Sequence, residues 1–314
     1  MKVKKRAILG QLSNADMRLL RVFKSVVDCG GMAAAELELN IGISTISKHV
    51  KDLETRLGLT LCHRGRSGFA TTAEGERIYQ ETQRLLAATD AFIRGVDEMH
   101  HRMGGQLNVA VFDKTASNPV ARLGEAIALF TQYAPDVELS MHVAPINTIE
   151  QGVMDGRFQV GIIPAHRSSA SLSYSELFGE SMLLYCGSKH PLFTARHEQL
   201  TWKSLHAYQF AGLGYHSPNM EISQKVRLAR KATGFDQESI ATLILSGQFL
   251  GFLPDHYAKS FEAEGLMRAV KPSRFRYDCS FVSTIRHSPS PLRVTQVFHD
   301  CLLLAHGKKR EQDV

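Results

Sequence analysis

The sequence lacks the residue patterns of disulfide frameworks, metal centres and membrane spans. Its five cysteines are scattered and include no CxxC pair, which argues against a disulfide framework or a zinc site and leaves a redox-sensing thiol as the alternative. The fourteen histidines form no HxxxH or HExxH set, so we expect no metal and no cofactor. No run of about 18 apolar residues occurs, so no membrane partner is expected. The apolar run at residues 7–9 is too short for a secretory signal, and we expect a cytoplasmic location.

The signatures of common enzyme classes are missing as well. The chain has no GxSxG nucleophile elbow and no GxxxxGK[ST] phosphate loop. The stretch Gly212-Leu213-Gly214 lacks the third glycine of a dinucleotide fingerprint. We therefore expect a binding protein and no enzymatic activity.

Positive charge is concentrated at one end of the chain. The first 72 residues hold twelve Lys and Arg against six Asp and Glu, so they carry the whole formal net charge of +6. A localised positive region is typical of a protein that binds a polyanion such as nucleic acid. A membrane surface is the competing partner, but these cations are interspersed with a compact helical core and do not line one amphipathic helix.

Three short helical patterns follow one another in residues 20–58. Apolar side chains recur at helical spacing over residues 20–27, an Ala- and Leu-rich stretch follows at 32–39, and residues 43–57 have one apolar face. Two helices joined by a turn of a few residues are the helix-turn-helix pattern. The other face of the third helix suits the major groove, where hydroxyls meet base edges and cations meet phosphates. A solvated surface helix is the alternative. The candidate residues on this face are Ser44, Thr45, Ser47, Lys48, His49 and Lys51.

A basic β-hairpin is predicted directly after the third helix. Gly65 and Gly68 favour a turn, and Arg64 and Arg66 lie near its tip, where they can reach a DNA backbone or minor groove. A helix-turn-helix followed by such a hairpin is a winged helix. Arg18, on the polar side of the first helix, is a further candidate for a phosphate contact. A solvated turn is the alternative for the two hairpin arginines.

A long helix is expected to start at Thr71 or Thr72, with the capping box Thr71-x-x-Glu74, and to run to residue 103, before two glycines. Apolar residues fall seven positions apart along it, which is the spacing of a coiled-coil seam, so we expect a homodimer. The alternative is a stripe that packs on the core of its own chain. The seam residues are Ile78, Leu85, Phe92 and Met99.

The remainder of the chain alternates strand and helix patterns, which predicts an α/β fold. Strands are expected at 106–112, 137–143 and 158–163, with helices at 119–133 and 145–156. From about residue 177 a second α/β unit is expected, with strands at 182–186, 208–213, 251–254 and 276–285 and helices at 219–233, 240–245, 255–264 and 291–306. The predicted divisions are a winged helix at 1–72, a linker helix at 73–104, an α/β region at 105–306 and a tail at 307–314. In that region, subdomain I takes 105–174 and 276–306, and subdomain II takes 175–275.

Taken in order, these features resemble the LysR family of transcriptional regulators. The matching residues of the first part are Leu20-x-x-Phe23, Gly30-Gly31-Met32, Ala34-Ala35, Leu39, Ser47-Lys48, Leu53-Glu54, Leu57-Gly58, Arg64-x-Arg66 and Thr72-x-x-Gly75. Those of the second part are Leu177-Phe178-x-Glu180, His190-Pro191-Leu192-Phe193 and Ser246-Gly247-x-x-x-Gly251-Phe252-Leu253-Pro254. The chain departs from the family at Gly42, where a capping Ser is usual, and at Ile43, where a polar base-reading residue is common. Ile43 can contact a thymine methyl group, so it stays among the candidates for DNA binding.

The resemblance implies an effector domain of two α/β subdomains, similar to periplasmic binding proteins, with a small metabolite bound between them. The cleft residues that it implies are Lys114, Thr115, Ser117, Asn118, Pro145, Ile146, Ile163, Gly214, Tyr215, Ser246, Gly247 and Gln248. Thr115 and Ser117 are expected to precede a helix N-terminus, which binds anions, so a carboxylate-bearing effector is predicted. An ordinary polar loop is the alternative.

The implied function is ligand-responsive, sequence-specific regulation of transcription. The expected partners are double-stranded DNA at a pseudo-palindromic promoter site, a small-molecule effector, further copies of the chain in a homodimer and homotetramer, and RNA polymerase. The alternative is an architectural or non-specific DNA-binding protein without effector control. That alternative leaves the long α/β half without a role.

Overall fold

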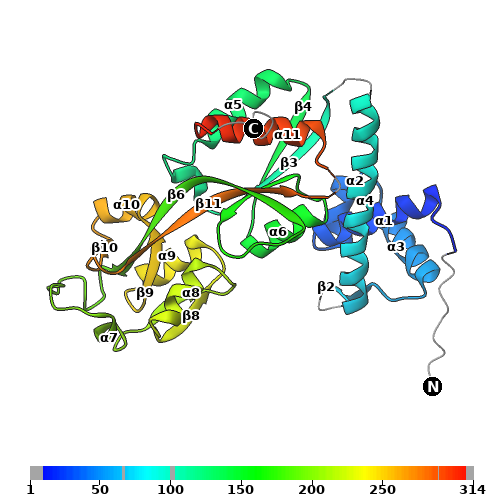
Figure 1. Ribbon diagram of the computed structural model, residues 1–314. Helices are drawn as coiled ribbons and strands as arrows, with labels where there is room; N and C mark the ends of the chain where they lie inside the picture. Colours follow the sequence, from blue (N-terminus) through cyan, green and yellow to red (C-terminus); the bar gives the residue numbers. More distant parts are fainter. Residues whose placement is uncertain (1–9, 66–67, 100–102, 289, 309–314) are drawn as a thin grey trace. The chain divides into compact units, whose positions relative to one another are not determined.

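The computed structural model describes residues 10–65, 68–99, 103–288 and 290–308 (Figure 1). Its internal contacts divide the chain into two compact units, and the boundary along the chain falls between Phe92 and Ile93. Among the described residues, no helix is both long and apolar enough to cross a membrane.

The first unit is a winged helix-turn-helix, as predicted. It contains α1 (Asn14–Asp28), α2 (Met32–Leu39) and α3 (Ile43–Leu57), then the antiparallel strands β1 (Cys62–Gly65) and β2 (Gly68–Thr71), and the first part of α4 (Ala73–Met99). Ser13 caps α1, because its hydroxyl accepts from the Asp16 backbone N–H while Asp16 Oδ2 accepts from Ser13 N. Asn40, in the turn between α2 and α3, adopts the left-handed conformation.

The core of the first unit comes from the apolar faces of α1 and α3. Phe23 and Val26 of α1 and Ile46, Val50 and Leu53 of α3 are fully buried. Each such side chain contributes about 1.5–3 kcal/mol through burial. Burying the apolar face of α3 leaves its opposite face free to meet a partner.

The start of α3 is capped from a neighbouring helix. Gly42 occupies the N-cap position and makes no side-chain cap. Glu36 of α2 compensates, since its Oε1 accepts a hydrogen bond of 3.2 Å from the Ile43 backbone N–H. A carboxylate at this position also stabilises the positive end of the helix dipole.

The capping residue of α4 is the second of the two threonines that the sequence offered. Thr72, and not Thr71, caps the helix, with its hydroxyl accepting from Gly75 N at 2.8 Å and donating to Thr60 O at 2.7 Å. Glu74 is therefore not part of a capping box. Position 75 favours glycine, because a Cβ atom there would lie 1.9 Å from the Leu61 carbonyl oxygen.

The second unit is built on one mixed sheet. Within the described residues, nine strands form this sheet, with β4-β3-β5-β11-β6-β9-β7-β8 in order and β10 paired with β6. The strands are β3 (Gly105–Val111), β4 (Val137–Val143), β5 (Val160–Pro164), β6 (Leu172–Gly187), β7 (Phe210–Leu213), β8 (Arg230–Gly234), β9 (Leu250–Pro254), β10 (Met267–Ala269) and β11 (Arg276–Arg286). The helices are α5 (Leu123–Tyr133), α6 (Ile146–Met154), α7 (Trp202–Leu205), α8 (Pro218–Lys225), α9 (Gln237–Leu245), α10 (Asp255–Ala263) and α11 (Arg293–Ala305).

Two long antiparallel strands, β6 and β11, run through both halves of this sheet (Figure 1). On one side, β3, β4 and β5 with α5, α6 and α11 form what we call the first lobe. On the other, β7 to β10 with α7 to α10 form the second lobe. Strands β3, β4 and β5 are parallel to one another, as are β7, β8 and β9. The two shared strands are the natural hinge between the lobes.

Several predicted elements of this unit were wrong in their bounds. The stretch 219–233 was predicted as one helix, but α8 ends at Lys225 and β8 begins at Arg230, because pairing with β7 overrides helical propensity. The helix predicted from residue 119 begins only at Leu123. Helix α9 begins at Gln237 with Asp236 as its cap, before the predicted start at 240, and α11 begins at Arg293, after the predicted start at 291. The strand predicted at 182–186 is the end of the longer β6.

Candidate nucleic-acid interface and ligand cleft

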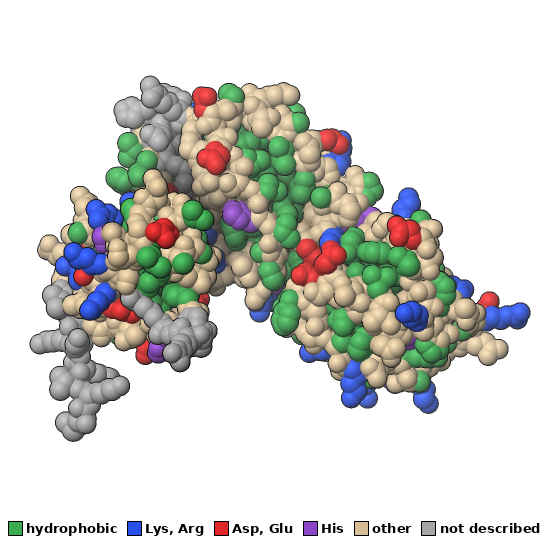
Figure 2. All heavy atoms as spheres, turned by 180° about the vertical axis from the view of Figure 1, so that it is seen from behind, with side chains coloured by type: hydrophobic (Ala, Val, Ile, Leu, Met, Phe, Trp, Pro, Cys, Tyr) green, Lys and Arg blue, Asp and Glu red, His purple; other side chains and the backbone are tan. Residues whose placement is uncertain are grey.

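The face of α3 opposite the core is exposed within the first unit. Ser44, Thr45, Lys48 and Lys51 are exposed, and Ile43 has 46% of its surface accessible. Lys and Arg side chains gather on this unit, at the left of Figure 2. Short polar side chains and cations on one helix face can reach base edges and phosphates together. The third helix therefore has the composition and exposure of a recognition helix.

Ser47 and His49 lie at the edge of this face and are half-buried. Nε2 of His49 lies 3.1 Å from the guanidinium of Arg18 on α1. Arginine is always a donor, so Nε2 is the acceptor in this bond and the proton of a neutral ring sits on Nδ1. The pair joins α1 to α3 and keeps a cation beside the exposed face.

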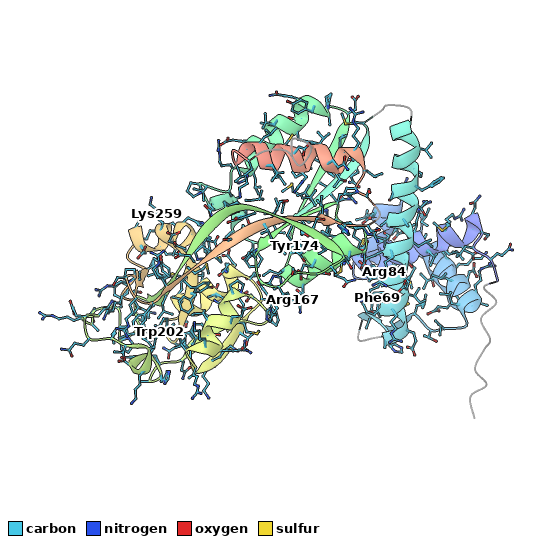
Figure 3. The ribbon with its side chains drawn as sticks, in the orientation of Figure 1. Phe69, Arg84, Arg167, Tyr174, Trp202 and Lys259 are labelled. Carbon is cyan, nitrogen blue, oxygen red and sulfur yellow. The ribbon has the colours of Figure 1, made fainter. Side chains whose placement is uncertain are left out.

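Of the two arginines in the β1–β2 hairpin, the structure describes only the backbone of Arg64. Arg64 pairs with Phe69 across the hairpin, and its side chain lies outside the described residues, as does the whole of Arg66. Figure 3 places Phe69 on β2 and Arg84 on α4.

The predicted seam of α4 divides into two parts. Ile78 and Leu85 pack against the core of their own unit. Phe92 has 73% of its surface exposed and Ile93 has 53%. The side chain of Met99 lies outside the described residues. A surface for a second copy is therefore available in the second half of the stripe.

In the second unit, a loop of the first lobe contacts the second lobe at several points, which we call the latch. Lys114 forms an ion pair with Glu238 of α9, and its ammonium group lies 4.6 Å from the ring centre of Tyr257. Ser117 Oγ lies 2.9 Å from Nδ1 of His256, at the start of α10. Nε2 of His256 lies 2.9 Å from the buried Glu180 carboxylate on β6.

A small space lies at the hinge, and we call it the hinge pocket. It has a volume of about 20 Å³, room for about one water molecule. Both lobes and the shared strands line it, with Phe112, Ile146, Pro164, Leu213, Gln237 and Tyr277 among the lining residues. The two lobes therefore contact one another around this pocket.

A wider groove opens beside the hinge pocket, on the other side of Glu180. This acidic groove has a volume of about 900 Å³ and is lined by Ser117, Asn118, Glu180, Asp255, Glu262 and Asp278, with His256 and Lys259. Figure 3 shows Lys259 on α10 and Tyr174 near the start of β6.

Asp113 lies two residues beyond the end of β3 and was not among the predicted residues. Its Oδ2 accepts from the Gln237 backbone N–H at 2.6 Å. Burial raises the pKa of this carboxyl to about 6, and the charges of Asp236 and Glu180 act in the same direction. Burial also raises the pKa of the neighbouring Tyr215, whose ring packs edge-on against Phe112 at 6.4 Å. The sequence signal that could have identified Asp113 was its position after a predicted strand, because ligands bind beyond the carboxyl ends of parallel strands.

The predicted cleft residues fall into three groups. Ile146 lines the hinge pocket, Pro145 caps α6 beside it, and Tyr215 contacts Phe112, while Gly214 lies against Thr233 and Phe235. Lys114 and Ser117 belong to the latch, Asn118 faces the acidic groove, Thr115 is buried, and Ile163 lines a separate cavity with Tyr174.

The third group lies away from the hinge pocket. Ser246, Gly247 and Gln248 follow the C-terminal end of α9, whereas the hinge pocket meets the N-terminal end at Gln237. Nine helical residues separate the two ends, which is about 13 Å at 1.5 Å per residue. Gly247 packs against Lys189 instead. The anion site predicted at Thr115 and Ser117 also lacks its helix, because these residues form a three-residue 3₁₀ turn and α5 begins only at Leu123.

A winged helix with an exposed cationic recognition helix, joined to a two-lobed α/β unit with a pocket at its hinge, defines the class of ligand-responsive DNA-binding regulators. The model of the LysR substrate binding domain matches residues 100–305, and that of the bacterial regulatory helix-turn-helix protein, lysR family, matches residues 17–76. The chain belongs to the LysR family of transcriptional regulators.

Individual relatives agree with this assignment. The HTH-type transcriptional activator BauR of Pseudomonas aeruginosa is 36% identical over 95% of this chain and 97% of its own length. The probable regulator LrrA of Synechococcus elongatus is 29% identical over 75% of this chain and 79% of its own. In fold, the crystal structure of the LysR family regulator CbnR is similar with a TM-score of 0.63 at 17% identity, covering 92% of this chain and 99% of that one. The structure of full-length CbnR with its target DNA has a TM-score of 0.61 at 18% identity and the same coverage.

Proposed function

We propose that this LysR-type regulator reads its DNA site through α3 and the wing. Ser44, Thr45, Ser47 and Lys48 would meet base edges, with Ile43 against a thymine methyl group. Arg18, His49, Lys51, Arg64 and Arg66 would hold the DNA backbone or minor groove. The observation that carries this proposal is the exposure of Ser44, Thr45, Lys48 and Lys51 on a helix whose opposite face, with Ile46, Val50 and Leu53, is buried in the unit.

Lys48 and Arg66 have separable roles under this proposal. Lys48→Ala removes a base contact, so affinity should fall by about ten- to hundredfold and sequence preference should relax. Arg66→Ala removes a wing contact and should weaken binding to all sequences alike. Fluorescence anisotropy with a selected operator and with random DNA of the same length measures both effects, and the exposed Lys231→Ala of β8 is the matched control. Uniform losses for both variants on both DNAs would contradict the assigned split.

We propose that the regulator binds DNA as a dimer joined through α4, and that two dimers form a tetramer. The exposed Phe92 and Ile93 support a contact between copies in the second half of the helix. Two winged helices related by a two-fold axis fit a pseudo-palindromic site whose half-sites lie about one helical turn apart. Contact with RNA polymerase and a cytoplasmic location belong to the same proposal, and family membership is their support.

Effector control would act through the hinge between the lobes. The latch and the hinge pocket describe a closed arrangement that opening must break, since Lys114 and Ser117 of the first lobe contact Glu238 and His256 of the second. A ligand that prefers one arrangement shifts the equilibrium between the two. The carboxylate-bearing effector expected from the sequence remains a prediction. The argument for it was a helix N-terminus after Thr115 and Ser117, and no α-helix begins there.

The architectural alternative makes a different prediction. A specific regulator keeps about 10³-fold or greater preference for its own site over random DNA, whereas an architectural protein does not. Competition between the two DNAs at fixed salt separates the proposals. An unchanged footprint with every ligand tested would favour the architectural protein.

A further inference from the structure

Strand β8 forms one end of the sheet of the second unit, and its outer edge is unpaired. Its inner edge pairs with β7, and just beyond this ladder the carbonyl oxygen of Gly234 accepts from Gly214 N at 2.9 Å. Main-chain groups point to alternate sides along a strand, so those of Lys231 and Thr233 point away from β7. Within the described residues, they have no hydrogen-bond partner. An open edge of this kind can accept a further strand.

Basic side chains surround the start of this edge, and we call them the basic cluster. Residues 222–235 contain four exposed cations and no Asp or Glu. A fifth, on α7, is held nearby because Nε2 of His206 donates to Val226 O at 2.9 Å. The cluster consists of Lys203, Lys225, Arg227, Arg230 and Lys231. No ion pair in the described part of the chain involves these side chains, so their charge is available to a partner. Figure 2 shows Lys and Arg side chains along the lower edge of the second lobe, where α7, α8 and β8 lie.

Hydrogen bonds hold the basic cluster beside the edge. Arg227 adopts the left-handed conformation, with φ of 53°, in the turn before β8, and its N–H donates to Gln224 O at 3.1 Å. The guanidinium of Arg230 donates to Leu213 O of β7 at 3.0 Å. Phe235 directly follows the strand and has 64% of its surface exposed. The edge therefore has cations at its start and an exposed aromatic ring at its end.

These features suit a polypeptide partner better than a nucleic acid. A duplex presents phosphate acceptors to a basic surface, so it would leave the outward carbonyl groups of Lys231 and Thr233 without donors. An extended peptide offers both donors and acceptors along its main chain, and strand addition uses both. An apolar side chain of such a peptide can also cover the ring of Phe235.

The cations decide which strand can pair here. Lysine on a strand edge prevents pairing with a second copy of the same chain. Two β8 strands side by side would bring two basic clusters together, and like charges on paired strands repel. The same cations attract a strand that carries carboxylates, since opposite charges across a strand pair are favourable.

We propose that the second lobe binds an extended acidic segment of another protein, which adds to the sheet as a strand beside β8. The carboxylates of the segment meet the basic cluster, and an apolar residue meets Phe235. This surface belongs to the second unit and is separate from the DNA interface on α3 and the wing, so the inference goes beyond the proposed function and does not depend on it.

The experiment measures the fluorescence anisotropy of a labelled synthetic peptide titrated with the full chain. The peptide alternates Glu with Val and ends in Phe, and its length of about eight residues exceeds β8, which spans about 16 Å at 3.3 Å per residue. Replacing Glu by Gln should weaken binding by about tenfold, because several exposed ion pairs are lost. Methylating the internal amide nitrogens keeps the charge but removes the main-chain donors, and should also weaken binding by about tenfold. Full binding of the methylated peptide, or no binding of the acidic one, overturns the proposal.

Two variants test the edge itself. Thr233→Pro removes an outward N–H and leaves the pairing with β7, because proline is tolerated on the solvent side of an edge strand. Lys231→Glu reverses one charge, and should bind a peptide with Lys in place of Glu more tightly than the unchanged chain does. Both variants should bind the acidic peptide more weakly, and the exposed Lys259→Glu of α10 is the matched control. Unchanged affinity of Lys231→Glu for both peptides overturns the proposal whether or not Thr233→Pro folds.

Other occupants of the edge are outcomes of the same experiment. Lys231→Glu should keep the DNA affinity and the sedimentation mass of the unchanged chain. If random duplex DNA displaces the peptide and Lys231→Glu abolishes this competition, the basic cluster binds nucleic acid and the proposal is wrong. If Lys231→Glu changes the mass, the edge is a contact between copies and the proposal is equally wrong.

Discussion

At the scale of single residues, Asp16 shows how one side chain caps its own helix and joins it to another helix of the first unit. It closes the capping box of α1 with Ser13 and accepts from the guanidinium of Arg56, near the end of α3, at 2.8 Å. The hydrogen bonds from Ser13, together with Arg56, hold the pKa of this carboxyl below its usual value. The role in the cap was predictable from sequence spacing, whereas the bond to Arg56, forty positions away, needed the fold.

Asp113 carries a pH-dependent cost in the unliganded protein. Its pKa is about 6 in the folded chain against an ordinary value of 3.8, so ionisation favours the unfolded chain. The cost is absent below about pH 3.8, grows as pH rises, and is complete above about pH 6, where it is on the order of 3 kcal/mol.

Asp113→Asn should therefore gain stability relative to the unchanged chain at neutral pH, and the gain should shrink as the pH falls from about 6 to about 4. Urea unfolding of both chains across this range measures the difference. Asp113→Asn can also lose a pH-independent amount of stability through a weaker bond to Gln237 N–H. This loss does not affect the test, because the test compares only how the difference in unfolding free energy changes with pH. A difference that does not change with pH contradicts the assigned burial.

At the scale of elements, the first unit was predictable because its signals are local. The glycines at 30 and 31, with φ of 72° and 158°, end the pattern of α1, and each helix repeats its apolar residues within itself. The second unit was less predictable at element ends. Residues 226–233 contain good helix formers, yet β8 gains its stability from pairing with β7, a partner that the local pattern does not contain.

Gly75 tests the contact between the start of α4 and the hairpin. Gly75→Ala brings a Cβ atom to 1.9 Å from Leu61 O, and because both sides are backbone we expect a loss of about 3 kcal/mol. Gly124→Ala in α5 is the matched control, since nothing lies within 4 Å of a Cβ there and alanine favours helix over glycine by about 1 kcal/mol. Scanning calorimetry should show a lower first-unit transition only for Gly75→Ala, and equal shifts would contradict the close approach.

At the scale of the whole molecule, the property to test is the proposed association between copies of the chain, which the structure of a single chain does not show. Phe92→Glu places a charge on a side chain that is 73% exposed, and we expect it to weaken the dimer because a coiled-coil seam excludes charge. Sedimentation equilibrium measures the mass of both chains. Leu37→Glu, on an α2 side chain that is 90% exposed, is the control. If Phe92→Glu has the same mass as the unchanged chain, the proposal that α4 forms the dimer interface is wrong.

The sequence by itself determined the recognition helix, the basic wing, the charge asymmetry and the α/β character of the second unit, because these depend on spacing and composition along short stretches. Only the tertiary structure decided which residues meet at the hinge. Asp113 and Gln237 stand 124 positions apart, and each alone reads as an ordinary polar residue. They come together because two parallel-stranded lobes share β6 and β11, which brings the end of β3 to the start of α9. A pocket assembled from distant strand ends has no local signal, since burial exists only after the chain folds.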